Sequence, residues 1–372
     1  MAHPASRSLA PAIRIRAEIL RVGARLVLRS PLLRALLARS RRARTCEGHR
    51  VDDDIAVVLG LDDRKGDTSI RGKSPRVARA QFAEGIASVE GRAPTGVTTR
   101  DLVYAAPEGT QRARLYTPAG APSGSPGILY IHGGGFMTCD IDTHDVFCRR
   151  LALGSSARVV SIEYRLAPEH PWPAAFDDSL AAYRWLVAHA AEFGIDPCRL
   201  AIAGDSAGGH LSALLGQVLR GEPRPPVLQA LIYPALDATC SRPSHRELGE
   251  GWLLTADMMD VFYSSYFGAN HAERATSRGS PLLAETVSGT PPALVYTAGF
   301  DPLKDEGFEY AERLRREGVA VRHHRFAHMI HGFITMTAAV PAARIACERM
   351  ASEIGEALRA GVPHDASRSR CG

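Results

Sequence analysis

The sequence predicts an α/β fold built around a mostly parallel sheet. From about residue 100 onward, short apolar runs alternate with stretches of helical periodicity, a pattern typical of a sheet with helices on both faces. A Gly-x-Ser-x-Gly motif at 204–208 joins one apolar run directly to a helical stretch. At 372 residues the chain can form one large domain with insertions, or two smaller domains.

Eight runs are predicted as strands. The first two, 101–105 and 113–117, are separated by a turn containing proline and glycine, which indicates an antiparallel hairpin at one edge of the sheet. The other six are 127–131, 158–163, 200–203, 228–233, 293–298 and 319–326. Helical patterns lie near 144–153, 175–193, 209–220 and 307–317. Functional side chains are expected where the parallel strands end at their carboxyl side.

The N-terminal part is expected to be helical and strongly basic. Residues 1–44 contain eleven arginines and a single acid, so they carry a charge of +10 and the rest of the chain carries −5. The main body therefore lacks the charge of a nucleic-acid-binding protein. Between Ile15 and Leu26, apolar side chains share one helix face and arginines occupy another. This segment packs on the protein, rests on an anionic membrane surface, or is a removable targeting segment.

Composition limits the cellular setting. No apolar run approaches 18 residues, so no transmembrane helix is predicted. The seven cysteines are scattered, odd in number and never paired as Cys-x-x-Cys, which argues against a disulfide framework or a zinc site and favours a reducing compartment. We expect a cytoplasmic protein, with peripheral membrane contact through the N-terminal helix as the alternative.

One stretch breaks the alternation of strands and helices. Residues 237–290 contain no convincing strand, yet several large apolar side chains recur there at helical spacing: Trp252, Met258, Met259, Phe262, Tyr263, Tyr266 and Phe267. This insertion is either ordinary core or one wall of a substrate pocket. The tail after Pro363 is short and polar, and we expect it to be disordered.

Ser206 is the candidate nucleophile. It stands at the centre of Gly204-Asp205-Ser206-Ala207-Gly208, between the run 200–203 and the helical pattern that follows. On such a strand-to-helix turn only small residues fit beside the serine, and its hydroxyl is held above the sheet. The motif alone is a weak signal, and its predicted context gives it weight.

A second motif supplies candidate donors for an oxyanion. His132-Gly133-Gly134-Gly135 follows the run 127–131 directly, and successive glycines leave backbone N–H groups unobstructed. Glycine loops also bind phosphates, but this loop does not end in Gly-Lys-Ser/Thr, and the sequence has no Gly-x-Gly-x-x-Gly dinucleotide fingerprint. The loop therefore favours acyl transfer.

The acid and the base should follow the nucleophile along the chain, in that order. Asp301 comes first after the run 293–298, whereas Asp305 and Glu306 are expected to begin the next helix, where the helix dipole favours acids. After the run 319–326 we choose His331, because Gly332 leaves room for its loop to bend over the serine. His328 is the rival base, and His323 and His324 are expected to be structural or exposed.

Together these motifs resemble the hormone-sensitive lipase-like branch of the α/β-hydrolases, which are bacterial carboxylesterases with a Gly-Asp-Ser-Ala-Gly-Gly signature. The resemblance covers roughly residues 95–355. Its matching segments are 132–136, 143–145, 164–170, 204–209, 301–307 and 331–333. Two positions depart from the family pattern: Cys139 stands where glycine is frequent, and Gly299 stands where glutamate is frequent.

The resemblance implies an α/β-hydrolase fold with an eight-stranded sheet and a helical cap. The cap would be formed by residues 1–90 and an insertion at 237–285, the catalytic domain would span 91–362, and 363–372 would be a flexible tail. The implied triad is Ser206, Asp301 and His331, without metal or organic cofactor, and the implied oxyanion donors are the N–H groups of Gly134, Gly135 and Ala207. Candidate substrate-pocket residues are Phe136, Trp252, Phe262 and Tyr263.

The expected activity is hydrolysis of short- to medium-chain acyl esters through an acyl-enzyme, with a small-molecule ester as the binding partner. An amide or lactone hydrolase with the same triad is the nearer alternative, and a small-molecule-binding protein that has lost catalysis is the more distant one. A homodimer through the edge strand near 319–326 is expected by analogy with the fold.

Overall fold

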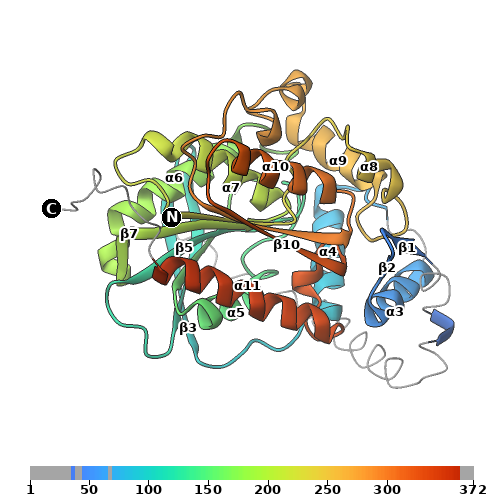
Figure 1. Cartoon of the computed structure of the whole chain (residues 1–372), viewed down its shortest axis with the longest axis horizontal. Coiled ribbons are helices and arrows are strands. Elements are labelled where there is room, and N and C mark those ends of the chain that lie inside the picture. The colour runs from blue at the N-terminus through green and yellow to red at the C-terminus, as the bar shows by residue number, and fades with distance from the viewer. Residues whose placement is uncertain (1–34, 38–43, 66–68, 361–372) are drawn as a thin grey trace.

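One eight-stranded sheet organises the structure. The computed structural model describes residues 35–37, 44–65 and 69–360, and its main strands lie in the order β10-β9-β8-β7-β5-β6-β4-β3 (Figure 1). Neighbours from β10 to β6 run parallel. β3 and β4 form an antiparallel hairpin, and β4 pairs antiparallel with β6. The predicted mostly parallel sheet of eight strands is therefore confirmed.

Each predicted run overlaps one strand. The strands are β3 (Val97–Ala106), β4 (Gly109–Pro118), β5 (Ser125–Ile131), β6 (Arg158–Ile162), β7 (Ile195–Asp205), β8 (Leu228–Ile232), β9 (Ala293–Phe300) and β10 (Val321–Ile330). β7 begins before its predicted run, because Ile195 still pairs with Ser125 of β5, and β10 ends after its predicted run, because Ile330 still pairs with Phe300 of β9.

Helices cover both faces of this sheet (Figure 1). Along β5, Ile128 and Tyr130 point into one core cluster, and Leu129 and Ile131 point into the other. The first cluster is closed by α5 (Asp145–Ser155) and α11 (Pro341–Ala360), and the opposite face by α6 (Ala174–His189), α7 (Ala207–Val218) and α10 (Lys304–Arg316).

Four of these helices overlap the predicted ones, but α11 is a helix that the sequence analysis did not expect. Its buried positions recur at helical spacing, yet three of the nine are alanine and one is glycine, and small side chains give only a weak apolar signal. Short 3₁₀ turns fill several connections: Asp63–Lys65, Ala190–Phe193, Leu219–Gly221, His271–Ala275, Pro281–Leu283 and Phe333–Thr335.

The described N-terminal part contains a small hairpin and two helices. β1 (Thr45–Cys46) and β2 (His49–Arg50) form the hairpin, and α3 (Asp53–Asp62) and α4 (Pro75–Val89) follow. The Asp52 carboxylate begins α3 by accepting hydrogen bonds from the N–H groups of Asp54 and Ile55 at 2.8 and 3.2 Å. The arginine-rich segment before residue 35, its proposed membrane contact and the tail after residue 360 lie outside the described residues.

The insertion is helical and contacts the N-terminal part. It contains α8 (Pro243–Glu247) and α9 (Ala256–Phe267) and no strand, as the sequence predicted. Phe82 of α4 meets Phe262 of α9 edge to face, with ring centroids 5.9 Å apart, and Arg71 donates to Asp260 at 2.7 Å. Figure 1 shows α4, α8 and α9 together at the end of the sheet toward which the parallel strands point. No helix in the described part of the chain is long and apolar enough to cross a bilayer.

Candidate active site

Ser206 lies in the sharp turn between β7 and α7. Its backbone has φ 53° and ψ −117°, a conformation that side chains rarely adopt and that indicates stored strain. The flanking glycines are required by space: a Cβ on Gly204 would lie 2.3 Å from the Gly208 carbonyl oxygen, and a Cβ on Gly208 would lie 1.9 Å from the Ile131 carbonyl oxygen. The predicted strand-to-helix turn is present, and it leaves the Ser206 side chain partly exposed.

His331 connects this serine to a buried carboxylate. Its Nε2 lies 2.9 Å from Ser206 Oγ, and its Nδ1 lies 2.8 Å from Asp301 Oδ2. Asp301 follows β9 and is fully buried, with its second oxygen held by the N–H of Leu303 at 2.8 Å. His331 follows β10, and Gly332 has φ 75°, which bends the chain directly after the histidine. Three residues from three strand ends are thus brought together.

The rival residues lie in other contacts. His328 is exposed and its Nδ1 donates to the Arg50 carbonyl at 2.7 Å. Asp305 accepts from the Ser244 N–H at 2.9 Å, and Glu306 is fully buried against His245 at 2.8 Å. Both acids therefore tie the start of α10 to the insertion.

The three backbone N–H groups of the predicted oxyanion site have no acceptor in the part of the chain that the structure describes. Within the described residues, the N–H groups of Gly134, Gly135 and Ala207 donate no hydrogen bond. Gly134 and Gly135 have φ 109° and 60°, respectively, which glycine adopts at little cost. A Cβ on Gly134 would lie 2.2 Å from the Thr138 carbonyl oxygen, so the loop closes tightly behind these donors.

Comparisons with known proteins identify the family of the chain. A family model described as alpha/beta hydrolase fold matches residues 128–335. The chain belongs to the α/β-hydrolase family. A carboxylic ester hydrolase of Mycobacterium tuberculosis, LipN, is 37% identical over 329 residues, with 87% of each chain covered. An ethyl acetate hydrolase of Pseudomonas putida is 41% identical over 267 residues, which cover 70% of this chain and 83% of that one.

Solved structures give the same result. The thermostable carboxylesterase EstE1, cloned from a metagenomic library, is 40% identical with a TM-score of 0.74, and the match covers 78% of this chain and 99% of that one. An ester hydrolase from the metagenome of Lake Arreo is 37% identical with a TM-score of 0.79, and the match covers 82% of this chain and 98% of that one.

A buried ion pair lies behind the glycine loop of this α/β-hydrolase. Asp205 Oδ1 lies 3.3 Å from His144 Nε2 and accepts hydrogen bonds from Tyr130 Oη at 2.6 Å and from the Gly133 N–H at 2.9 Å. Burial by itself would raise the pKa of Asp205, but the charge of His144 and these hydrogen bonds lower it. Burial by itself would lower the pKa of His144, but Asp205 raises it. Both shifts favour the charged form of the residue concerned, and the hydrogen bond from the Gly133 N–H to Asp205 holds the start of the loop.

The four candidate pocket residues are placed in two different surroundings. The Phe262 ring lies directly over Gly135, where an added Cβ would be 2.2 Å from Phe262 Cγ. Phe136 is buried and stacks on Tyr266 with ring centroids 3.7 Å apart, and Tyr263 is buried beneath the Arg274 guanidinium. Trp252 packs apart from these three, in the core cluster on the α11 face, against Phe300, the residue before Asp301.

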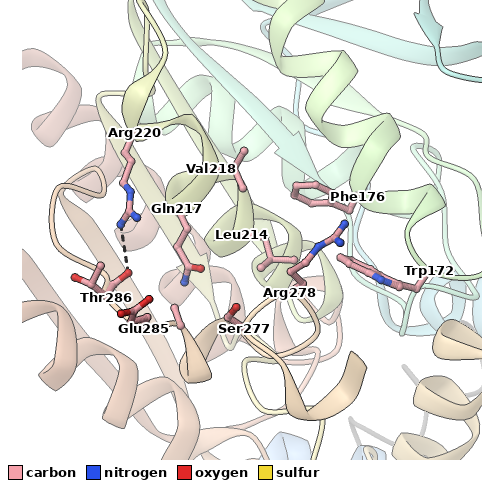
Figure 2. A pocket seen from close by; sticks show the side chains of 11 residues that line it. Trp172, Phe176, Leu214, Gln217, Val218, Arg220, Ser277, Arg278, Glu285 and Thr286 are labelled. Atoms are coloured by element: carbon pink, nitrogen blue, oxygen red, sulfur yellow. Dashed lines mark hydrogen bonds between the residues drawn. The ribbon is translucent and has the colours of Figure 1, made fainter. Parts of the chain in front are cut away.

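A pocket of about 420 Å³ lies farther along α7 (Figure 2). Its lining residues are Trp172, Phe176, Leu214, Gln217, Val218, Arg220, Ser277, Arg278, Ala284, Glu285 and Thr286. None of the predicted site residues is among them. Trp172, which lines it, contacts Tyr266 with ring centroids 5.8 Å apart, and Tyr266 stacks on Phe136. The rings of Trp172, Tyr266 and Phe136 therefore separate this pocket from the glycine loop.

The two departures from the family pattern each have a local explanation. Cys139 has φ 68°, a conformation that favours glycine, and its Cβ packs where a Cβ on Gly134 would come within 2.9 Å. Cys139 therefore packs against the loop beside Gly134. A Cβ on Gly299 would lie 2.1 Å from the Ala327 carbonyl oxygen, so glycine allows β9 to approach β10 where its register shifts.

Sequence reasoning missed two groups that surround the site. Asp205 and His144 both lie in motifs quoted for the resemblance, but no local pattern indicates that they pair across 61 residues. Arg79 of α4 donates from Nε to the Met137 carbonyl at 2.9 Å. Nothing in the sequence around Arg79 distinguishes it from the other arginines.

Proposed function

We propose that this α/β-hydrolase is a serine carboxylesterase that acts on short- to medium-chain acyl esters. The observation that supports the proposal most directly is His331, which lies within hydrogen-bond distance of both Ser206 Oγ and Asp301. The relatives named as carboxylic ester hydrolases and as an ethyl acetate hydrolase support the ester as the substrate class.

In the proposed mechanism, Ser206 Oγ attacks the ester carbonyl carbon while His331 Nε2 takes its proton. Asp301 holds the imidazole in the tautomer with Nδ1–H and stabilises the imidazolium that forms. The oxyanion accepts hydrogen bonds from the N–H groups of Gly134, Gly135 and Ala207, each contributing roughly 2 to 4 kcal/mol in the transition state.

The leaving alcohol then takes the proton from His331, and the acyl group stays on Ser206. In the second half, water attacks this ester while His331 takes a proton from the water. Collapse of the second oxyanion returns the proton to Ser206 Oγ and releases the carboxylic acid. The chemistry uses only side chains and backbone groups of this chain.

Aromatic side chains over the glycine loop limit the size of the substrate. Phe262 covers Gly135 directly and is backed by Phe82, so two aromatic rings narrow the space beside the oxyanion donors. A narrow site accepts small acyl groups, and this supports the preference for short and medium chains. We place the cap of this enzyme at α4 and at α8 and α9 of the insertion.

The test is hydrolysis of p-nitrophenyl esters from C2 to C16, with and without a serine-directed phosphonate. We expect phosphonate-sensitive turnover with an optimum between C4 and C8. Ser206→Ala should lower kcat by at least about 10³-fold and leave the melting temperature close to that of the wild type. Mutant activity within tenfold of the wild type would exclude Ser206 as the nucleophile, and an optimum at C16 would contradict the substrate size.

The leaving group is tested separately. Ester and anilide substrates with the same acyl group should differ strongly in favour of the ester. Faster turnover of the anilide would instead identify an amidase with the same triad.

A further inference from the structure

The glycine loop, residues 132–139, has an unusual backbone. Gly134, Gly135, Phe136 and Cys139 all have positive φ, with values of 109°, 60°, 61° and 68°. Two of these residues are not glycine, and a side chain stays in this region only where the surrounding contacts impose it. The loop that carries the proposed oxyanion donors therefore depends on anchors outside itself.

The first half of the loop is anchored by the sheet and the segment after β6. The Gly133 N–H donates to Asp205 at 2.9 Å, the His132 carbonyl accepts from Tyr164 Oη at 2.9 Å, and the Phe136 carbonyl accepts from the Ala167 N–H at 2.9 Å.

The second half is anchored by a residue from the N-terminal part of the chain. Arg79 lies on α4 and donates from Nε to the Met137 carbonyl at 2.9 Å. Its Nη2 donates to the carbonyl of Ala167 at 3.1 Å, and Ala167 is the residue whose N–H holds Phe136. One guanidinium thus closes a ring of hydrogen bonds around residues 136–137.

The guanidinium is itself held in place. Glu169 accepts from Arg79 Nη1 at 2.9 Å and from Nη2 at 2.6 Å, a two-point contact that fixes the plane of the fork. A lysine has no such fork and could not contact both carbonyls and the carboxylate with the same geometry.

We propose that Arg79 is a positioning residue that couples helix α4 to the glycine loop and so keeps the Gly134 and Gly135 N–H groups aligned with Ser206. The proposal rests on the proposed esterase function, because it concerns the oxyanion site of that reaction. Arg79 acts through Met137 and Ala167 and does not touch the substrate. In this view the N-terminal part completes the active site as well as covering it.

The test uses the full chain with Arg79→Gln and Arg79→Lys. Arg76 provides the matched control, since it lies on the same helix, is exposed, and its side chain has no hydrogen bond or ion pair within the described residues. On a butyrate ester we expect kcat to fall about 10- to 100-fold in Arg79→Gln, with KM changed less than about threefold, because a small displacement of oxyanion donors acts on the transition state. Arg79→Lys should be intermediate, and the two corresponding Arg76 variants should stay within about twofold of the wild type.

Two further measurements separate positioning from a general loss of folding. Titration with a phosphonate counts reactive serines, so that kcat is expressed per active site. Hydrogen exchange followed in a peptide covering residues 134–142 reports on the loop, where the N–H groups of Met137 and Thr138 donate to the Gly134 carbonyl. Exchange there should be faster in the Arg79 variants than in the Arg76 controls.

The proposal is overturned if kcat per reactive serine and loop exchange both match the controls, even where the melting temperature falls. If the wild-type protein hydrolyses no ester, the proposed function fails, and loop exchange alone then decides whether Arg79 positions the loop.

Discussion

At the scale of single residues, a buried carboxylate outside the proposed triad lies beside the nucleophile. Asp205 stands next to the nucleophile in the chain, and its carboxylate holds Gly133, Tyr130 and His144 together. Removing one partner of a buried ion pair leaves the other without compensation, which typically costs about 3 to 5 kcal/mol. The geometry of the glycine loop and the stability of the fold are therefore linked at this residue.

Asp205→Asn should lower both the stability of the fold and the catalytic rate. We expect a loss of about 3 to 5 kcal/mol in the free energy of unfolding and a decrease in kcat, because Gly133 loses its charged acceptor. Urea denaturation and ester kinetics measure the two effects. The double variant Asp205→Asn/His144→Gln is the control and should be more stable than the single variant, since no unpaired histidine charge remains. A single variant as stable as the wild type would show that the pair is not charged.

Two other buried histidines make stability depend on pH. Burial, reinforced for His132 by the charge of His144, lowers the pKa of His132 to about 4, and burial lowers the pKa of His210 to about 4. Between pH 6.5 and 4 the unfolded chain binds protons that the folded chain excludes. Stability should therefore be retained above pH 6.5 and fall as the pH is lowered toward 4.

His210→Asn should reduce the dependence of the free energy of unfolding on pH in this range. Asparagine can keep a donor for the Ala235 carbonyl, which His210 Nδ1 contacts at 2.8 Å, but it does not titrate. The free energy of unfolding, measured from pH 4 to 6.5, should change by up to about 1.4 kcal/mol less per pH unit than in the wild type. An unchanged slope would mean that His210 binds its proton equally in both states.

At the scale of elements, we expect helix α9 to set how much room the acyl group has. Its Phe262 lies over Gly135 and meets Phe82 of α4, so the insertion and the N-terminal part form one aromatic wall. Phe262→Ala should open this wall and move the acyl optimum from C4–C8 toward longer esters. The nitrophenyl ester series measures the shift, with Met258→Ala on the same helix as the control. If both variants had the same acyl-length optimum, the acyl group would lie away from Phe262.

At the scale of the whole molecule, the sheet ends in an edge strand, and the segment after β2 contacts the carboxyl end of this strand, where the Asp52 N–H donates to the His328 carbonyl at 3.0 Å. β10 is the last strand on its side of the sheet, and Phe308 of α10 lies beside it with 53% of its surface exposed, its ring centroid 5.6 Å from that of His323. An edge strand with an exposed aromatic neighbour favours association. The dimer expected from the sequence therefore remains a prediction, and β10 with the neighbouring Phe308 is the surface through which it would form.

Light scattering after size-exclusion chromatography tests this association. The wild-type protein should have the mass of a dimer at micromolar concentration, and Phe308→Glu should shift it toward the monomer without changing kcat. A wild-type monomer at those concentrations would contradict the prediction, as would a Phe308→Glu variant that remains a dimer.

The sequence by itself determined the parts of this protein that depend on local pattern. Alternation of apolar runs and helical stretches gave the sheet and four of its covering helices, and the order of Ser206, Asp301 and His331 after their strands gave three residues that lie within hydrogen-bond distance in the structure. These features could be predicted because strand ends and glycine turns depend on residues that are close together in the sequence, and the order of motifs is given by the sequence itself. Helix α11 was missed because alanine at its buried positions weakens the same kind of signal.

Only the tertiary structure decided which distant residues support the site. The pairing of Asp205 with His144, the ring of Phe262 over Gly135 and the contact of Arg79 with Met137 join segments that are far apart in the chain. Each depends on how helices and loops pack above the strand ends, and packing is set by the shape of the whole core rather than by any local motif. The sequence thus carries the candidate chemistry, and the fold supplies the geometry on which that chemistry depends.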